Sequence, residues 1–556
     1  MPHLRNLVFA AACAFALTTV SPARPAESQE GEVEKALARI RPEAIRAHMR
    51  FLADDLLEGR GTGSRGYELA ARYVAARFEA LGLAPAGTGG SYFQPVPLRR
   101  VLTIDPKCSL ALIRDGKRTE LKYGDDYLLT TSALAETDIQ VTAPMVYAGF
   151  GVSAPELGYD DYAGIDVKGK IVVLLIGAPA TFPHDQRAYY SVTPLKADAA
   201  LARGAVAVLG FLTPTDAQRV PWDSYVRALK APSYQWLTEA GVAYRARPQA
   251  RGFGALNRKV VESLFAAAPH SLDEVFKAAE AGRPLSFALP LQAGIHTVSE
   301  HGRAESPNVA ALLRGSDPKL RDEVVVLTAH LDHLGIGEPI AGDAIYNGAY
   351  DNASGVASLL EMANAFASLP APKRSVLFLA VTGEENRLQG SEYFVHHPTV
   401  PRDHIVADIN VDMILMLHPL RDVIAFGAEH SSLGQTTERA ARRLGLALSP
   451  DPFPEEVVFI RSDQFSFVLE GIPSLFLNPG FKTDDPAAGP AAVQKWLQTT
   501  YHHPNDDMSQ MFDFEAGAQF VRLNFLVSYL VAQDAEAPRW KPGDFFGESH
   551  AGNPTR

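Results

Sequence analysis

The sequence predicts an α/β protein: a mostly parallel mixed sheet flanked by helices, with an inserted β-rich segment. From about residue 305, apolar runs of strand length alternate regularly with segments of helical periodicity. Such alternation favours a parallel sheet covered by helices. Between about residues 135 and 290, short β-rich runs predominate instead. We therefore expect an N-terminal part at 27–134, an insert at 135–290, and the main part of the sheet at 291–556.

The composition is typical of a globular protein and excludes disorder as the main state. Hydrophobic residues make up 47% of the 556 residues and charged residues 21%, so the chain can bury a sizeable core. At about 150 residues per domain, this length suggests three or four domains. The 52 basic and 64 acidic residues give a net charge of -12. This balance argues against a nucleic acid partner and against binding to anionic lipid.

The cysteine content limits the kinds of metal site that the chain can form. The two cysteines are Cys13 and Cys108, and Cys13 lies in an apolar N-terminal run. A mature chain without that run has a single cysteine, which excludes an intramolecular disulfide and a cysteine-based zinc cage. Any metal site must therefore use His, Asp and Glu.

The first 26 residues are predicted to be a signal peptide. Arg5 precedes an apolar run at 7–20, and a small-residue context for cleavage follows at 21–23. The run is short for a membrane span, although an uncleaved anchor is the alternative. No later stretch has about 20 uninterrupted apolar residues. We expect an exported protein, periplasmic or secreted, with no stable membrane span after cleavage.

The segment from 27 to about 100 is predicted to be largely helical. Residues 32–57 alternate between charged and apolar, and a Gly-rich stretch at 60–66 interrupts them. Residues 67–81 repeat apolar side chains at helical spacing and end before Gly82. No strand precedes the Gly-x-Gly at 61–63, so we interpret it as a loop and not as a phosphate site.

The insert is predicted to contain strands at 144–152, 171–177 and 205–212, with a helix at 188–203. The run at 171–176 is continuously apolar, as expected of a strand that is buried on both faces. The insert shows no His, Asp and Glu cluster with ligand spacing.

The main part is predicted to alternate between strands and helices. We expect strands at 324–327, 375–381, 405–413 and 473–477, and helices at 354–369, 434–444 and 514–532. In an open α/β sheet, reactive residues lie at the carboxyl ends of the strands. Five motifs are compatible with that rule, at 328–333, 347–355, 382–386, 410–413 and 501–506.

These motifs contain the residue types of a site for two divalent metals. Two His and three acidic residues can enclose two such ions, which prefer imidazole and carboxylate ligands. One carboxylate must then bridge, and Asp351 is the natural candidate because it opens a helix. In Glu384-Glu385, one carboxylate can bind metal while the other stays free as a base. Each motif alone has an ordinary structural interpretation, such as a helix cap or a surface pair. A metal site would be excluded only if all of these ordinary interpretations were correct at once.

The motifs, in this order, closely resemble those of the di-zinc aminopeptidases of peptidase family M28. The resemblance is carried above all by residues 329–335 (AHLDHLG) and 345–349 (IYNGA). Residues 146–151 and 159–162 resemble a protease-associated (PA) insert, which exported bacterial members of the family carry. The resemblance implies a zinc aminopeptidase fold of the phosphorylase/hydrolase-like type.

The resemblance also implies a set of metal ligands and two Zn²⁺ per chain. His330 and Asp412 would bind one zinc, Glu385 and His502 would bind the other, and Asp351 would bridge them. His502 is favoured over His503 because the first His of Tyr-His-x-Pro-x-Asp is the ligand in the family.

Three further residues receive catalytic roles from the resemblance. Glu384 would be the general base, Asp332 would orient His330, and Tyr501 would stabilise the oxyanion. One position departs from the family pattern, because Gln464 stands where many members have His. That position is expected near the substrate, so substrate specificity is uncertain there and metal binding is not.

The implied reaction is removal of N-terminal residues from peptides that have a free N-terminus. A carboxypeptidase and a dipeptidase on the same fold are alternatives, and the glutaminyl-cyclase branch is disfavoured by the insert and the full ligand set. A non-catalytic binding ectodomain is disfavoured because all five ligands and the base are present. A di-metal phosphoesterase is disfavoured because such sites usually contain more His in a different order.

Overall fold

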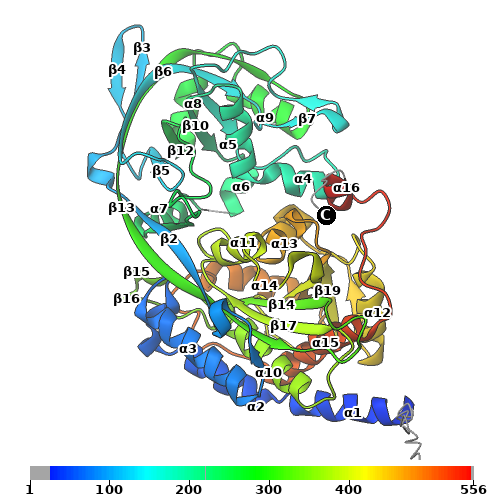
Figure 1. Cartoon of the computed structure of the whole chain (residues 1–556). Coiled ribbons are helices and arrows are strands. Elements are labelled where there is room, and N and C mark those ends of the chain that lie inside the picture. The colour runs from blue at the N-terminus through cyan, green and yellow to red at the C-terminus, as the bar shows by residue number, and fades with distance from the viewer. Residues whose placement is uncertain (1–25, 220, 552–556) are drawn as a thin grey trace, which may run out of the picture.

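The fold was analysed in a computed structural model that describes residues 26–219 and 221–551. The chain forms a lower and an upper body (Figure 1). Two long antiparallel strands, β2 (Phe93–Thr103) and β13 (Ser286–Leu313), run from one body to the other. The predicted signal peptide lies, apart from its last residue, outside the described residues.

The lower body contains the predicted sheet. Parallel pairing joins β14 (Val324–His330) to β17 (Ser375–Val381) and β18 (Ile405–Asn410), and joins β18 to β21 (Ser474–Pro479). The end of β13 pairs antiparallel with β17. The remaining strands are β19 (Asp422–Phe426), antiparallel to β21, and β20 (Ala447–Ser449), parallel to β19. The predicted fold class, a mostly parallel mixed sheet flanked by helices, is confirmed.

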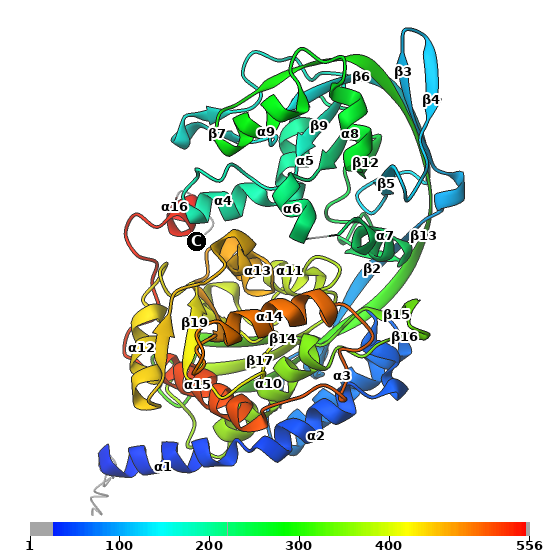
Figure 2. The ribbon, with the colours of Figure 1, turned by 180° about the vertical axis from the view of Figure 1, so that it is seen from behind.

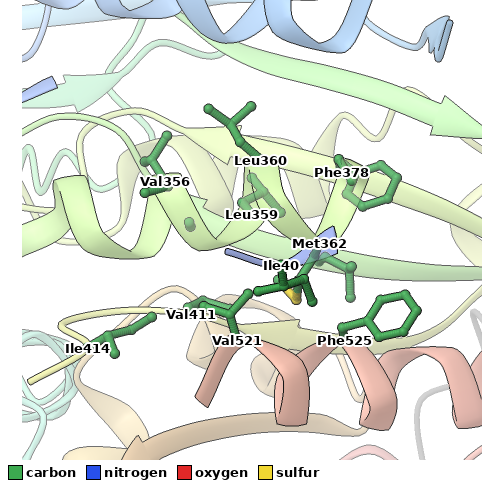
Figure 3. Packing of buried hydrophobic residues seen from close by; sticks show 14 of the residues in the cluster. Ile40, Val356, Leu359, Leu360, Met362, Phe378, Val411, Ile414, Val521 and Phe525 are labelled. Carbon is green, nitrogen blue, oxygen red and sulfur yellow. The ribbon is translucent and has the colours of Figure 1, made fainter. Parts of the chain in front are cut away.

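Helices cover both faces of this sheet. One face carries α1 (Ala26–Arg39), α2 (Pro42–Leu52), α3 (Arg65–Ala80), α10 (Ser354–Ala367) and α15 (Phe514–Gln533), whose apolar side chains share one core. In that core, Val521 and Phe525 of α15 lie close to Ile40 and Val411 (Figure 3). The other face packs against α11 (Gln389–His396) and α13 (Gln464–Leu469). Two further helices, α12 (Leu433–Arg443) and α14 (Ala488–Thr499), add side chains to the core that α10 and α15 share.

The upper body has its own hydrophobic core. Its strands are β3 (Ser109–Arg114), β4 (Lys117–Glu120), β5 (Tyr127–Thr130), β6 (Asp138–Ala148), β9 (Ile171–Leu175), β10 (Ala207–Phe211) and β12 (Gly252–Leu256). Its helices are α4 (His184–Ser191), α5 (Thr193–Ala202), α6 (Pro214–Arg219), α7 (Trp222–Lys230), α8 (Arg258–Phe265) and α9 (Leu272–Glu280). Leu110 and Leu129 pack in this core together with Val173, so the upper body includes chain that precedes residue 135.

Five short strands and a last helix complete the fold. They are β1 (Ala84–Pro85), β7 (Ser153–Ala154), β8 (Tyr159–Asp160), β15 (Gly335–Ile340), β16 (Asp343–Tyr346) and α16 (Phe545–Ala551). A further strand, β11 (Ser233–Trp236), pairs with β2 and so returns from the upper body to the lower one. Among the described residues, no helix combines the length and the apolar character that crossing a membrane requires.

The expectation of a largely helical segment up to about residue 100 is wrong at β2. This strand contains Pro95 and Pro97 and two consecutive arginines, so its sequence has no clear strand alternation. Its partner is residues 299–309 of β13, about 200 residues further along the chain. Pairing over such a separation depends on the tertiary fold, because intrinsic strand propensity is weak compared with cross-strand packing.

Candidate metal centre

The five motifs of the main part meet at the carboxyl ends of the parallel strands. His330 is the last residue of β14, Glu384 and Glu385 follow β17, and Asp412 follows β18. Asp351 lies in a tight turn before α10, and the loop that carries His502 precedes α15. Residues far apart in the sequence therefore converge at one edge of the sheet, as expected for parallel strands.

A first group of possible ligands surrounds the imidazole of His330. Its Nε2 lies 3.1 Å from Asp412 Oδ1 and 3.2 Å from Asp351 Oδ1. All three side chains are buried. Asp412 is held by a second contact, because Ser462 Oγ donates to its Oδ2 at 2.7 Å.

A second group surrounds His502 and shares Asp351 with the first. His502 Nε2 lies 3.2 Å from Asp351 Oδ2 and 3.2 Å from Glu385 Oε2. Asp351 thus turns one carboxylate oxygen to each group. His503 faces away from these ligands, and its Nδ1 donates to the carbonyl of Tyr501 at 2.8 Å.

The spacing of these atoms fits zinc. Ligands at about 2.0–2.1 Å in a tetrahedral arrangement lie about 3.3–3.4 Å from one another. The four distances between His Nε2 atoms and carboxylate oxygens are 3.1–3.2 Å, close to that value. Two imidazoles and three carboxylates are also a donor set that borderline metals prefer.

The electrostatics of the cluster also fit a cation. Burial alone would lower the pKa of His330, but the charge of Asp412 and hydrogen bonds with Asp351 and Asp412 raise it well above its usual range. The pKa of His502 is raised in the same way, against the effect of burial, chiefly by Glu385. The pocket therefore stabilises positive charge at both imidazoles, at the positions where metal ions would sit.

His333 is a residue that the site prediction missed. Its Nδ1 lies 2.7 Å from Glu385 Oε1 and 4.0 Å from Asp351 Oδ2, so it also falls within reach of the second group. The shorter distance is that of a charge-assisted hydrogen bond, whereas His502 is equidistant from both carboxylates. This difference favours His502 as a candidate ligand and His333 as a residue that orients Glu385. His333 is the second His of the AHLDHLG motif, so the sequence signal that could have identified it was present.

The adjacent residues Glu384 and Glu385 have opposite electrostatic surroundings. Burial and the negative charges of Glu385 and Asp412 raise the pKa of Glu384 well above its usual value, although His330 opposes this. Burial would also raise the pKa of Glu385, but the charge of His502, with His333, lowers it to about 2. Among the described residues, the Glu384 carboxylate has no hydrogen-bond or ion-pair partner. One carboxylate is thus committed to the cluster, and the other is free to exchange a proton.

Asp332 contacts both His330 and the loop that carries Glu384. Its Oδ2 accepts a hydrogen bond from Thr62 Oγ1 at 2.9 Å and its Oδ1 accepts one from the backbone N–H of Glu384 at 3.2 Å. His330 Nδ1 donates to the backbone carbonyl of Asp332 at 3.1 Å, and the carboxylate lies further away, at 3.9 Å. The backbone of Asp332 therefore orients the imidazole, and its carboxylate positions the loop of Glu384.

Tyr501 lies against His502, with ring centroids 3.8 Å apart and the rings stacked. Burial, together with the charges of Asp351 and Glu385, raises the pKa of Tyr501 to about 12, although His502 and Arg461 lower it. The hydroxyl therefore stays protonated at neutral pH and is available as a hydrogen-bond donor.

Gln464 is fully buried and has both ends of its amide engaged. Its Oε1 accepts from Asn410 Nδ2 at 2.8 Å and its Nε2 donates to the carbonyl of Phe459 at 2.7 Å. The residue therefore joins the end of β18 to α13.

Two further residues that the site prediction missed hold the ligand loops in place. The carboxylate of Asp506 accepts the backbone N–H groups of Tyr350 at 2.9 Å and of Asp351 at 3.1 Å. It thereby couples the loop of His502 to the turn of Asp351. The other residue is Arg60, in the Gly-rich stretch that the sequence indicated to be a loop.

Arg60 is almost fully buried and donates only to backbone carbonyls. Its guanidinium binds the carbonyls of Leu331 at 2.9 Å, Asn347 at 2.6 Å, Gly348 at 3.0 Å, and Leu52. Burial lowers the pKa of Arg60 to about 10, although acidic neighbours oppose this. One side chain thus fastens α2 to the two loops that carry His330 and Asp351.

Replacing Arg60 by methionine is expected to lower the free energy of unfolding by about 3 kcal/mol or more, since several buried carbonyls would lose their donors. Urea unfolding followed by tryptophan fluorescence measures this. Arg65→Met is the matched control, because Arg65 is 74% exposed and its ion pair to Glu58 is 3.5 Å long. The control should change stability by about 0.5 kcal/mol at most. Equal effects of the two substitutions would contradict the role of Arg60.

Comparison with known proteins relates this site to peptidases. The sequence profile described as Peptidase family M28 matches residues 308–524. A protein named "probable leucine aminopeptidase 2", from Aspergillus oryzae, is 29% identical over 217 residues, which cover 37% of this chain and 40% of that protein. A protein named "Probable zinc metalloprotease", from Pyricularia oryzae, is 36% identical over 109 residues, or 19% of this chain and 20% of that protein. The chain thus spans less than half the length of these relatives.

One solved structure resembles almost the whole chain. It is titled an aminopeptidase from Aneurinibacillus sp. strain AM-1, and it covers 91% of this chain and 97% of its own with a TM-score of 0.54. Its sequence identity of 18% limits the likeness to the fold, including the upper body.

Proposed function

We propose that the chain is a zinc-dependent aminopeptidase that removes N-terminal residues from peptides, and the match of residues 308–524 to the Peptidase family M28 profile supports this. The observation that carries the proposal is the position of Asp351 between two imidazole–carboxylate groups, with one carboxylate oxygen 3.2 Å from each His Nε2. This arrangement suits two zinc ions that share a bridging carboxylate. Glu384, an unpaired carboxylate with a raised pKa, lies beside it.

The proposed ligand set assigns His330 and Asp412 to one zinc, His502 and Glu385 to the other, and Asp351 to both. Bound zinc supplies two kinds of chemistry: it lowers the pKa of a coordinated water and polarises the carbonyl of the scissile bond. The protein's contribution is to hold five ligands rigidly at strand ends and to keep their imidazoles oriented.

Glu384 carries the proton in the proposed mechanism. Its carboxylate takes a proton from the attacking water and returns it to the nitrogen of the leaving amine. A raised pKa suits both steps, because a general base that must later act as an acid works best with a pKa near the working pH. Asp332 fixes the backbone N–H of Glu384 at 3.2 Å, so the base is held in place.

Tyr501 is proposed to stabilise the negative charge that develops on the substrate carbonyl. Its hydroxyl is protonated at neutral pH, and its ring is fixed by stacking on His502. A fixed donor of this kind costs no reorganisation when the charge appears.

We also propose that residues 1–26 are a signal peptide, that the mature protein is periplasmic or secreted, and that the upper body is a PA-type insert. An apolar run shorter than a membrane span, flanked by a basic residue and a small-residue cleavage context, supports export. The net charge of -12 argues against a nucleic acid partner.

A panel of substrates tests the proposed activity. We expect aminoacyl-p-nitroanilides with a free amine to be cleaved and their N-acetylated counterparts to resist, because an aminopeptidase must recognise the α-amine. A chelator should abolish cleavage, and added Zn²⁺ should restore it. Cleavage of N-blocked peptides but not of free-amine substrates would falsify the aminopeptidase assignment.

A carboxypeptidase or dipeptidase is the second candidate, and Arg461 is the observation that favours it. Its side chain is about half exposed and lies near Tyr501 and Glu384. A guanidinium there could bind a terminal carboxylate in a bidentate manner. In that case N-blocked dipeptides would be substrates, and their C-terminal amides would not.

A further inference from the structure

A second cluster of histidine and carboxylate side chains lies where the upper and lower bodies touch, and it shares no residue with the predicted metal centre. His184 and Asp185 come from α4 of the upper body, Glu429 and His430 follow β19 of the lower body, and Asp544 precedes α16. The two helices α4 and α16 lie side by side in both views of the chain (Figure 2).

The orientation of His430 is fixed by Asp544. His430 Nδ1 donates to Asp544 Oδ2 at 2.7 Å, while Asp544 Oδ1 accepts the backbone N–H groups of Phe546 and Gly547 at 3.0 Å. The imidazole also stacks on Phe459, with ring centroids 4.9 Å apart. With its proton on Nδ1, the neutral ring presents a bare lone pair at Nε2.

Among the residues that the structure describes, the buried Nε2 atom of His430 has no hydrogen-bond partner, and the side chain is only 2% exposed. It faces Asp185 Oδ1 at 3.7 Å and Glu429 Oε1 at 3.6 Å. These distances are too long for hydrogen bonds. Two ligand atoms that are each about 2.1 Å from one metal ion lie about 3.0–3.6 Å apart for angles between 90° and 120°. The gap therefore has the size that a cation needs.

The surroundings add a further donor and more negative charge. His184 Nδ1 lies 3.3 Å from Asp185 Oδ1. Asp451 lies close enough for the charges of His184 and Glu429 to act on its pKa. Within the described part of the chain, His184 Nε2 and Asp451 Oδ2 are both buried without a hydrogen-bond partner. A buried polar atom without a hydrogen-bond partner lowers the stability of the folded protein. A cation bound between these atoms would offset that effect for several of them at once.

We propose that His430 Nε2, Asp185 and Glu429 bind a divalent transition metal ion of the Zn²⁺ type, with His184 available as a fourth ligand. Imidazole together with carboxylates is the donor set for such ions. Asp544 would orient the ligating ring through Nδ1–H, as carboxylates commonly do behind metal-binding histidines.

The site would tie the two bodies together. On one side they are joined by the strands β2 and β13. The proposed ion would join them on the other side, because Asp185 belongs to the upper body and Glu429 and His430 to the lower one. It would also hold the last helix, α16, through Asp544, so the ion would restrict movement of the upper body.

Zinc stoichiometry of the full chain tests this proposal. After equilibrium dialysis against buffered Zn²⁺, elemental analysis should show one zinc fewer per chain in Asp185→Asn and in Glu429→Gln than in the wild type. Both residues are partly exposed, at 29% and 54% of the side chain, so neither substitution should prevent folding. Glu438→Gln is the matched control, because Glu438 is a 57% exposed carboxylate of the lower body outside the cluster.

The outcomes separate this site from the proposed catalytic one. Both variants should cleave aminoacyl-p-nitroanilides at the wild-type rate and lose the increase in melting temperature that added Zn²⁺ gives the wild type at this site. If the catalytic centre bound no zinc, either substitution would still lower the zinc content by one equivalent per chain relative to the wild type. Unchanged stoichiometry and zinc affinity in both variants would overturn the proposal and leave His430 as a buried imidazolium between carboxylates.

Discussion

Replacing Glu384 by glutamine is expected to abolish peptide hydrolysis while the zinc content stays unchanged. Glutamine has nearly the same shape but cannot accept a proton from water, so the proton transfers of the proposed mechanism are lost. General acid–base catalysis is worth about 10²–10⁴-fold, and we expect kcat on an aminoacyl-p-nitroanilide to fall by at least about 10²-fold. The carboxylate makes no ion pair with the described ligands, so its loss should leave both metals bound.

The control for this experiment is Glu438→Gln, which makes the same chemical change on an exposed face of α12. It should retain the wild-type rate and zinc content. A Glu384→Gln enzyme with more than about a tenth of wild-type kcat would rule out the assigned role, because general-base loss costs about 10²-fold or more. A loss of zinc together with the loss of rate would instead identify Glu384 as a ligand.

Replacing Asp351 by alanine is expected to remove both zinc ions, because its two carboxylate oxygens face different imidazoles at 3.2 Å each. Asp412→Ala is the matched comparison, since Asp412 belongs to one group alone. It should reduce the zinc content of the predicted centre by one. Elemental analysis after dialysis measures the difference, and the rate of hydrolysis should fall by at least about 10³-fold in Asp351→Ala, where all metal-assisted chemistry is lost.

One result would contradict the bridging role of Asp351. If Asp351→Ala keeps as much zinc as Asp412→Ala, the carboxylate does not bridge and the centre holds its ions independently. Circular dichroism checks that both variants are folded, because the backbone N–H of Asp351 is held by Asp506 whatever the side chain is.

The main sheet was predictable because its strands carry their own signal. Runs such as 324–327 and 375–381 are apolar on both faces, and the polar motifs follow them directly. The spacing of strands and helices then brings the motifs to one edge. The strand β2 had no such signal, because its two prolines and paired arginines obscure the alternation, and its partner lies about 200 residues away.

Most of the residues that support the site could not be predicted from the sequence. Arg60 belongs to a Gly-rich loop, and nothing in its neighbourhood indicates that its guanidinium binds carbonyls near residues 331 and 347. Ser462 and Asp506 likewise act through contacts with distant loops. The cluster around His430 draws on three segments, near residues 185, 430 and 544, and no spacing rule relates them.

By itself, the sequence determined the fold class, and it predicted which His and carboxylate residues would bind a divalent metal. These follow from local patterns, since apolar runs form strands and polar motifs at their ends become ligands. The tertiary structure decided how the residues differ from one another. It gave adjacent Glu384 and Glu385 opposite pKa shifts, turned His502 toward Asp351 and His503 away, and set His333 against Glu385. The physical reason is that pKa and ligand geometry depend on burial and on charges a few ångströms away, and both are fixed only when distant segments pack together.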